Sequence, residues 1–178
     1  MKDYIKKILI TSEEIESKVK ELANGITNDY KDKDLVVIGV LKGAAVFMSD
    51  LIKYIDVPLT MDFIAVSSYG RSTESSGVVK MIKDLEESIE GKDVLIVEDI
   101  IDTGLTLSYL IENLKSRGPR SVRICTLLDK PERRKVDVKV DYMGFKIPDE
   151  FVVGYGIDFA ENYRNSPFIS VVKEECYK

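Results

Sequence analysis

The chain has 178 residues, which is enough for one domain with a small appended lobe and too few for two full domains. A hydrophobic fraction of 44% with 32% charged residues is typical of a soluble globular protein and excludes a disordered chain. The net charge of -5 provides no global basic field for non-specific nucleic-acid binding, and the absence of histidine excludes His-dependent triads, His-ligated zinc and His general bases. Carboxylates, lysines and tyrosines must carry any proton chemistry.

Cysteine usage and the lengths of the apolar runs indicate the compartment. Two cysteines, Cys125 and Cys176, are too few for a four-cysteine metal site, and a disulfide framework is not expected. The N-terminus has no apolar run of signal-peptide length, and no segment approaches the roughly 18 apolar residues of a membrane span. We therefore expect a single cytoplasmic domain over residues 1–178 with no membrane partner.

The first part of the chain predicts a helix, a strand and a second helix. Thr11 and Glu14 form the Thr-x-x-Glu pattern of a capping box, and apolar residues at helical spacing follow, so a helix is predicted over 11–24. The nearly continuous apolar run 35–41 is typical of a strand buried on both faces. Helical spacing of apolar residues then predicts a helix over 43–55.

Two further strands, over 59–66 and 78–82, are predicted on either side of a polar insert. The insert, 67–77, is rich in serine and has little apolar surface. A loop of this length inside a compact domain is often a lid. We therefore expect 67–77 to close over a ligand.

The second half of the chain continues the alternation of strands and helices. Apolar runs predict strands over 94–97 and 122–128, and helical spacing predicts a helix over 103–115 between them. Shorter strands are predicted towards the C-terminus, over 136–142, 151–153 and 168–172. Because parallel neighbours need crossover helices, this order predicts an α/β fold with a parallel sheet covered by helices on both sides.

The candidate ligand-binding segment joins the strand over 94–97 to the next helix. The start of the predicted helix suits an anion, because it offers free backbone amides, a glycine that lets a ligand approach the backbone closely, and two hydroxyls. These groups belong to Thr103, Gly104 and Thr106. The short acidic turn before it carries the carboxylates of Glu98, Asp99 and Asp102. Carboxylates suit a divalent cation or accept hydrogen bonds from sugar hydroxyls. A sugar phosphate with magnesium meets both conditions. Alternatively, Asp99 and Asp102 only cap the helix and Glu98 is solvated.

Residues 94–106 resemble the phosphoribosyl-pyrophosphate-binding signature of type I phosphoribosyltransferases. Four further motifs, in order, resemble the hypoxanthine-guanine phosphoribosyltransferases: Leu41-Lys42-Gly43, Ser68-Tyr69-Gly70, Leu128-Asp129-Lys130-Pro131 and Phe151-Val152-Val153-Gly154-Tyr155, followed by Asp158 and Arg164. The resemblance extends over 35–172. It implies a central, mostly parallel sheet flanked by helices, with a small hood built from the chain ends.

The resemblance also implies how phosphoribosyl pyrophosphate is held. The sugar phosphate is bound by the signature loop: Glu98, Asp99, Ile100, Ile101, Asp102, Thr103, Gly104, Leu105 and Thr106. Leu105 stands where some members have lysine, so backbone amides are expected to bind the phosphate. Pyrophosphate contacts Lys42, Gly43 and Arg164 under a lid that includes Ser68 and Tyr69. Mg²⁺ is held by Glu98, Asp99 and Asp158.

The purine site is implied in the same way. Lys130 donates to the exocyclic oxygen of a 6-oxopurine, so adenine, which presents an amino group there, is expected to be a poor substrate. Phe151 stacks on the purine, and the Val152 backbone meets the base edge. Asp102 is the general base at N7. Without the resemblance, Lys130 alone suggests no more than a surface lysine.

The implied function is purine salvage. The 5-phosphoribosyl group moves from phosphoribosyl pyrophosphate to hypoxanthine or guanine, giving IMP or GMP and pyrophosphate, in an Mg²⁺-dependent dimer or tetramer without a nucleic-acid partner. One alternative is an RNA-binding attenuation protein, which requires a local basic face, whereas the basic run 133–135 is interpreted as a solvated loop. A second alternative is an adenine- or xanthine-preferring enzyme.

Overall fold

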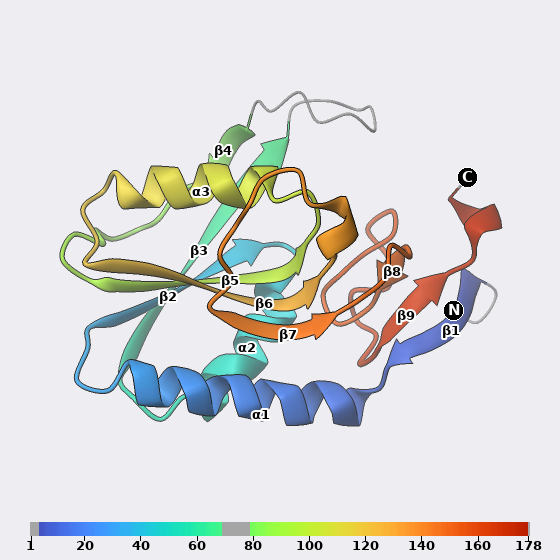
Figure 1. Cartoon of the computed structure of the whole chain (residues 1–178), viewed down its shortest axis with the longest axis horizontal. Coiled ribbons are helices and arrows are strands. Elements are labelled where there is room, and N and C mark those ends of the chain that lie inside the picture. Colours follow the sequence, from blue (N-terminus) through green and yellow to red (C-terminus); the bar gives the residue numbers. More distant parts are fainter. Residues whose placement is uncertain (1–3, 69–78, 178) are drawn as a thin grey trace.

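The computed structural model describes residues 4–68 and 79–177 (Figure 1). Its larger sheet has the strand order β4-β3-β2-β5-β6-β7. The β3–β4 pair is antiparallel and the other neighbouring pairs are parallel, which confirms the predicted mostly parallel sheet. The strands are β2 (Leu35–Leu41), β3 (Leu59–Ser68), β4 (Val79–Lys83), β5 (Asp93–Ile101), β6 (Ser121–Asp129) and β7 (Tyr142–Lys146).

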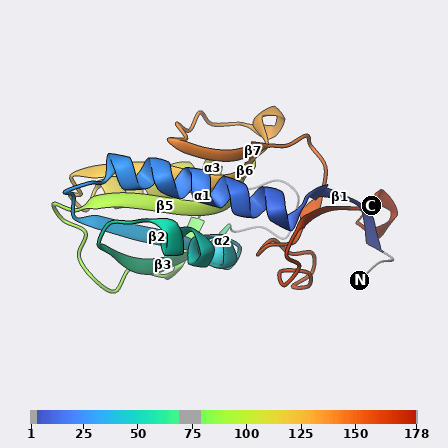
Figure 2. The same cartoon turned by 90° about the horizontal axis from the view of Figure 1, so that it is seen from below.

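Helices cover both faces of this sheet, as the order of elements predicts. Helices α1 (Ser12–Asp29) and α2 (Ala44–Leu51) lie on one face, and α3 (Leu105–Lys115) lies on the other (Figures 1 and 2). The Thr11 hydroxyl accepts from the Glu14 amide at 3.2 Å and the Thr11 amide donates to the Glu14 carboxylate at 2.8 Å, so the capping box is confirmed. Helix α1 runs beyond the predicted end at residue 24 because burial of Ile26 outweighs the weak helix propensity of Gly25.

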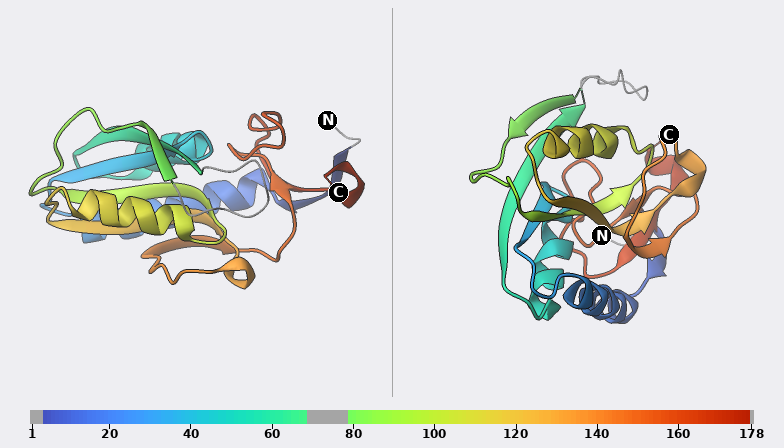
Figure 3. Two further views of the ribbon diagram at one scale, coloured as in Figure 1. Left: turned by 90° about the horizontal axis from the view of Figure 1, so that it is seen from above. Right: turned by 60° about the vertical axis from the view of Figure 1, so that its left-hand side comes forward.

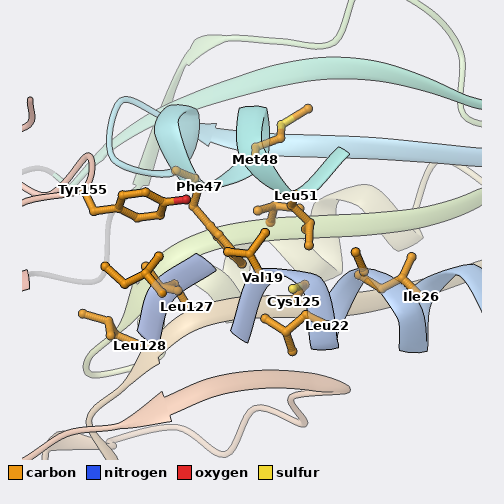
Figure 4. Close-up of a cluster of buried hydrophobic side chains, with 14 of the residues drawn as sticks. Val19, Leu22, Ile26, Phe47, Met48, Leu51, Cys125, Leu127, Leu128 and Tyr155 are labelled. Carbon is orange, nitrogen blue, oxygen red and sulfur yellow. The ribbon is translucent and has the colours of Figure 1, made fainter. Parts of the chain in front are cut away.

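Two apolar layers hold the helices on the sheet. On the α1 and α2 face, side chains such as Val19, Phe47 and Leu127 pack together (Figure 4). On the α3 face, Leu107, Leu110 and Leu114 pack on buried residues of β2 and β5. The apolar runs of β2, β5 and β6 are buried on both faces. This rigid centre fixes the positions of the loops that leave the strand ends.

A second sheet joins the two ends of the chain. Its strands are β1 (Ile5–Ile10), β9 (Ile169–Val172) and β8 (Val152–Val153), in that order and antiparallel. It lies beyond one end of the main sheet (Figure 3) and confirms the predicted hood. Strand β1 was not predicted, because most of its side chains face solvent and its apolar residues do not alternate.

Several predicted boundaries are wrong at the ends of strands. Strand β5 continues through Glu98 and Asp99 to Ile101, so the acids end a strand instead of forming a turn, and α3 starts at Leu105 instead of Thr103. The predicted strand over 136–142 is an irregular segment, and β7 follows it. That segment buries Val138 without a strand partner, while the Val136 amide donates to the Thr103 carbonyl.

The structure also differs from the prediction at the end of the second helix and at the start of the polar insert. The helix predicted over 43–55 ends at Leu51 and passes into the 3₁₀ turn Ile52–Tyr54. Ser67 and Ser68, placed in the insert by the sequence, continue β3 and pair with β4. The rest of the predicted lid, including Tyr69, lies outside the described residues. Among the described helices, none is long and apolar enough to cross a membrane.

Candidate active site

The predicted site residues gather where β2, β5 and β6 end. Lys42 and Gly43 follow β2, the turn of Asp102 to Gly104 follows β5, and Lys130 follows β6. Because these strands are parallel and adjacent, their carboxyl ends share one edge of the sheet. A cavity of about 230 Å³ lies there, lined among others by Glu98, Ile100, Ile101, Asp102, Thr103, Gly104 and Thr106.

The turn into α3 is held in a specific conformation. Gly104 has φ of 82°, in the left-handed region that favours glycine, and an added Cβ would lie 2.9 Å from the Val136 carbonyl oxygen. The Thr103 carbonyl accepts from the Lys135 amide at 2.9 Å and from the Val136 amide at 3.2 Å. The first amides of α3 have no acceptor within the helix, so this braced turn presents an anion site to the cavity. The Leu105 amide is an exception in this structure, because it donates a long hydrogen bond of 3.4 Å to the Thr103 hydroxyl.

Glu98 and Asp99 form a crowded acidic pair at the end of β5. Burial raises the pKa of Glu98 well above its usual 4.5, and the neighbouring charge of Asp99 raises it further. Burial also raises the pKa of Asp99. A Cβ on Gly43 would overlap the Asp99 carboxylate, so the Lys42-Gly43 loop packs directly on this acid. A cation beside this pair would offset the repulsion between the two carboxylates.

Asp158 and Arg164, the other predicted phosphate-side residues, pair with each other. Arg164 Nη2 lies 2.8 Å from Asp158 Oδ1, and the Glu161 amide donates to Asp158 Oδ2 at 2.9 Å. Arg164 Nη1 donates to the Gly156 carbonyl at 2.8 Å. Within the described part of the chain, no group of three acidic, cysteine or histidine side chains is close enough to hold a metal ion. The structure therefore does not bring Asp158 together with Glu98 and Asp99.

Glu161 is a site residue that sequence reasoning missed. Its Oε2 lies 2.8 Å from Lys42 Nζ, and its Oε1 lies 3.4 Å from Arg164 Nη2. The Glu161 backbone is left-handed, with φ of 63°, a conformation that is uncommon outside glycine and that often occurs at functional loops. No local pattern could have revealed this contact, because Lys42 and Glu161 are 119 positions apart.

The interpretation of residues 133–135 as a solvated loop is only partly right: Arg133 and Lys135 are exposed, but Arg133 and Arg134 form ion pairs. Arg133 Nε lies 2.8 Å from Asp102 Oδ1, and Arg134 forms an ion pair with the buried carboxylate of Asp129. Both contacts arise because the 3₁₀ turn Pro131–Arg133 folds the chain back over the end of β6. Arg133 therefore lies next to Asp102, the predicted general base.

Lys130 is buried, so the interpretation as a surface lysine is excluded. It is 7% exposed, and its amide donates to the Ile101 carbonyl at 2.9 Å. Its Nζ lies 3.8 Å from Asp149 Oδ1. Burial lowers the pKa of Lys130, and the charges of Asp102 and Asp149 oppose that effect. The buried Lys130 side chain therefore offers a hydrogen-bond donor where little water competes for it.

The remaining predicted residues lie near the junction with the hood. The Phe151 ring stacks on Tyr177 with ring centroids 4.8 Å apart and an interplanar angle of 25°, and it meets Phe159 edge-on at 5.5 Å. Tyr177 was not anticipated from the sequence. Val152 is buried at the start of β8. Ser68 ends β3.

Comparisons with known proteins identify the family and the fold. The sequence model of the phosphoribosyl transferase domain matches residues 7–160. The hypoxanthine-guanine phosphoribosyltransferase of Bacillus subtilis (strain 168) is 60% identical over 178 residues, covering 100% of this chain and 99% of that protein. A crystal structure of a hypoxanthine phosphoribosyltransferase from Staphylococcus aureus has 56% identity and a TM-score of 0.96, covering 99% of this chain and 96% of that one. A Trypanosoma cruzi hypoxanthine phosphoribosyltransferase mutant, solved as a ternary substrates complex, has 45% identity and a TM-score of 0.93, with 99% and 100% covered.

Proposed function

Because the chain belongs to the phosphoribosyltransferase family, we propose that it transfers the 5-phosphoribosyl group from phosphoribosyl pyrophosphate to hypoxanthine or guanine. The products are IMP or GMP and pyrophosphate, so the enzyme acts in purine salvage. One observation carries the proposal: a braced helix start, a partly buried acid pair with raised pKa values and a buried lysine share a single edge of the sheet. These three features match the phosphate, ribose and 6-oxopurine parts of the reaction.

The sugar phosphate is proposed to bind at the start of α3. The amides of Gly104, Leu105 and Thr106 offer donors that need no side-chain cation, and the positive end of the helix dipole favours the anion. The hydroxyls of Thr103 and Thr106 can add hydrogen bonds. The lining of the cavity by Thr103, Gly104 and Thr106 supports this assignment.

Glu98 and Asp99 fit a magnesium site. Their pKa values are raised because they are buried together, and Mg²⁺ commonly uses one or two carboxylates with substrate oxygens and water as its other ligands. When bound, Mg²⁺ neutralises the charge that builds on the leaving pyrophosphate. Asp158 is proposed as a further ligand, which requires that Arg164 release its carboxylate. Glu98 and Asp99 also offer acceptors to the ribose hydroxyls.

Pyrophosphate is proposed to bind between Lys42, Gly43 and Arg164. In the structure, Glu161 lies against both Lys42 and Arg164, so a carboxylate already sits beside the two cations that the pyrophosphate would need. Ser68 and Tyr69 are proposed to belong to a lid over this group, which excludes the water that would otherwise hydrolyse the activated sugar. Preorganised cations at the leaving group stabilise the charge of the transition state.

The purine is proposed to lie between Phe151 and the end of β6. Lys130 donates to the exocyclic oxygen, the backbone of Val152 meets the base edge, and Phe151 supplies a stacking face. Asp102 accepts the N7 proton, which becomes more acidic as the bond at N9 forms. If Asp102 has this role, Asp102→Asn lowers the rate of the chemical step by about 10²- to 10⁴-fold.

Location and assembly complete the proposal. Cys125 and Cys176 are free thiols, which supports a cytoplasmic location. We expect a dimer or a tetramer. The RNA-binding alternative loses its support because Arg133 and Arg134 pair with carboxylates of this chain.

A spectrophotometric assay tests the proposal directly. The purified chain is mixed with phosphoribosyl pyrophosphate and Mg²⁺ and with hypoxanthine, guanine, xanthine or adenine in turn. We expect turnover with hypoxanthine or guanine, little with adenine, and none when EDTA removes Mg²⁺. Absence of turnover with both 6-oxopurines, or efficient turnover of adenine, would contradict the proposed function.

A further inference from the structure

Arg133 stands where three loops of the site meet. It ends the 3₁₀ turn Pro131–Arg133, which directly follows Lys130. The turn after β5 presents Asp102 to it, and the segment before β8 presents Asp149. One guanidinium therefore contacts carboxylates from two different loops at the proposed purine site.

The contacts divide between two nitrogens of the guanidinium. Nε lies 2.8 Å from Asp102 Oδ1, and Nη1 lies 3.5 Å from Asp149 Oδ1. Lys130 Nζ lies 3.8 Å from the same Asp149 oxygen. The planar guanidinium group of an arginine can bind two acceptors at once in this way, whereas the ammonium group of a lysine acts as a point charge.

The two oxygens of Asp102 are in different surroundings. Oδ1, the oxygen next to Arg133, is shielded from solvent, while the side chain as a whole is 40% exposed. The exposed part of the side chain is therefore not Oδ1, and Asp102 is one of the residues that line the cavity. The Nε contact is an ion pair without hydrogen-bond alignment, and such contacts often tighten when substrate binds.

We propose that Arg133 is a positioning residue for Asp102. It holds Oδ1 against the wall of the site and so directs the other oxygen towards the purine N7. The inference rests on the proposed function, in which Asp102 accepts the N7 proton. A carboxylate without this anchor can rotate, and an error of about 1 Å in the position of a catalytic group can cost 10²-fold in rate.

A purely structural role does not account for the arrangement. Arg133 is 46% exposed and its two partners are 40% and 46% exposed, and exposed ion pairs contribute little to stability. Arg117 makes a comparable ion pair with Asp84, at 2.7 Å, on a different part of the surface. Arg117→Gln is therefore a matched control for loss of an exposed arginine–aspartate pair.

A double-mutant cycle on the full chain tests the inference. Single-turnover rates with phosphoribosyl pyrophosphate, Mg²⁺ and hypoxanthine are measured for the parent, Arg133→Gln, Asp102→Asn and the double variant. We expect Arg133→Gln to lower the rate about 10- to 100-fold, with KM for both substrates changed much less. In the Asp102→Asn background the same change should cost less than about 3-fold. Arg133→Lys should restore part of the rate, and Arg117→Gln should leave it unchanged.

Each other outcome overturns the inference in a recognisable way. Equal losses in the two backgrounds would mean that Arg133 acts independently of Asp102. A rise in KM for hypoxanthine without a slower chemical step would mean that Arg133 acts on Lys130 through Asp149. An unchanged rate in an active parent would remove the role altogether. Failure of the proposed function is distinct, because the parent itself would then show no turnover.

Discussion

Glu161 Oε2 lies 2.8 Å from Lys42 Nζ, and the other carboxylate oxygen of Glu161 lies 3.4 Å from Arg164. Lys42 and Arg164 are the cations that we propose to bind the pyrophosphate. A pyrophosphate anion must therefore compete with a carboxylate of the chain for both of them. The pair between Lys42 and Glu161 is solvent-exposed on both sides, so the competition at Lys42 is modest.

Glu161→Gln is expected to strengthen pyrophosphate binding about two- to five-fold, because the amide no longer competes as an anion. Isothermal titration of inorganic pyrophosphate in the presence of Mg²⁺ measures the effect. Glu87→Gln makes the same charge change in the exposed segment that precedes β5, at the opposite edge of the sheet, and should leave affinity unchanged. Equal affinities for the parent and Glu161→Gln would show that Glu161 does not compete.

Glu98→Gln is expected to stabilise the chain in the absence of ligand while weakening catalysis. The folded state raises the pKa of Glu98 above 4.5, so it binds the proton more tightly than the unfolded state. The stability contribution of Glu98 therefore falls as pH rises above 4.5. The variant should melt about 2 to 4 °C higher than the parent near neutral pH.

The same comparison at about pH 4.5 should give a smaller difference in melting temperature, because the parent side chain is then largely protonated in the folded state. The Mg²⁺ and phosphoribosyl pyrophosphate concentrations needed for turnover should rise in Glu98→Gln. A variant that melts below the parent at neutral pH would contradict the inference that ionised Glu98 destabilises the folded chain.

Gly43→Ala is expected to lower turnover about 10²-fold or more, because the added Cβ overlaps the Asp99 carboxylate and must displace the acid or the loop. Gly25→Ala is a matched control. A Cβ at Gly25 meets only the Tyr142 ring at 3.9 Å, and alanine favours the helix that contains it. Steady-state assays and circular dichroism of both variants separate loss of the site from loss of the fold. Full activity in Gly43→Ala would contradict the close packing of this loop on Asp99.

Lys130→Ala is expected to lose most turnover of hypoxanthine and guanine while binding of phosphoribosyl pyrophosphate survives. The reason is that Lys130 is assigned to the base alone. Lys130→Met keeps an apolar chain in the buried position, so it separates loss of the ammonium group from a packing defect. Lys139→Ala, at an exposed site, serves as the control. Retention of most turnover in both Lys130 variants would remove this residue from base recognition.

The sequence by itself determined the elements that depend on short-range information. Apolar periodicity and helix capping act over a few positions, so a few consecutive residues are enough to predict such elements. Examples are the buried runs of β2, β5 and β6, the capping box of α1 and the glycine-containing turn into α3. The motifs of the candidate site are also local and could be found in the sequence. Parallel neighbouring strands bring their carboxyl ends to one edge, so motifs that follow them must meet.

Only the tertiary structure decided which charges and rings face each other. Arg133 and Asp102, Glu161 and Lys42, and Tyr177 and Phe151 come from separate loops, and no local pattern specifies such pairs. Strand β1 likewise forms because β9 is there to pair with it, although its own sequence is mostly exposed. The physical reason is that ion pairs, ring contacts and edge-strand pairing depend on how loops cross in space, whereas burial periodicity and caps are properties of each segment.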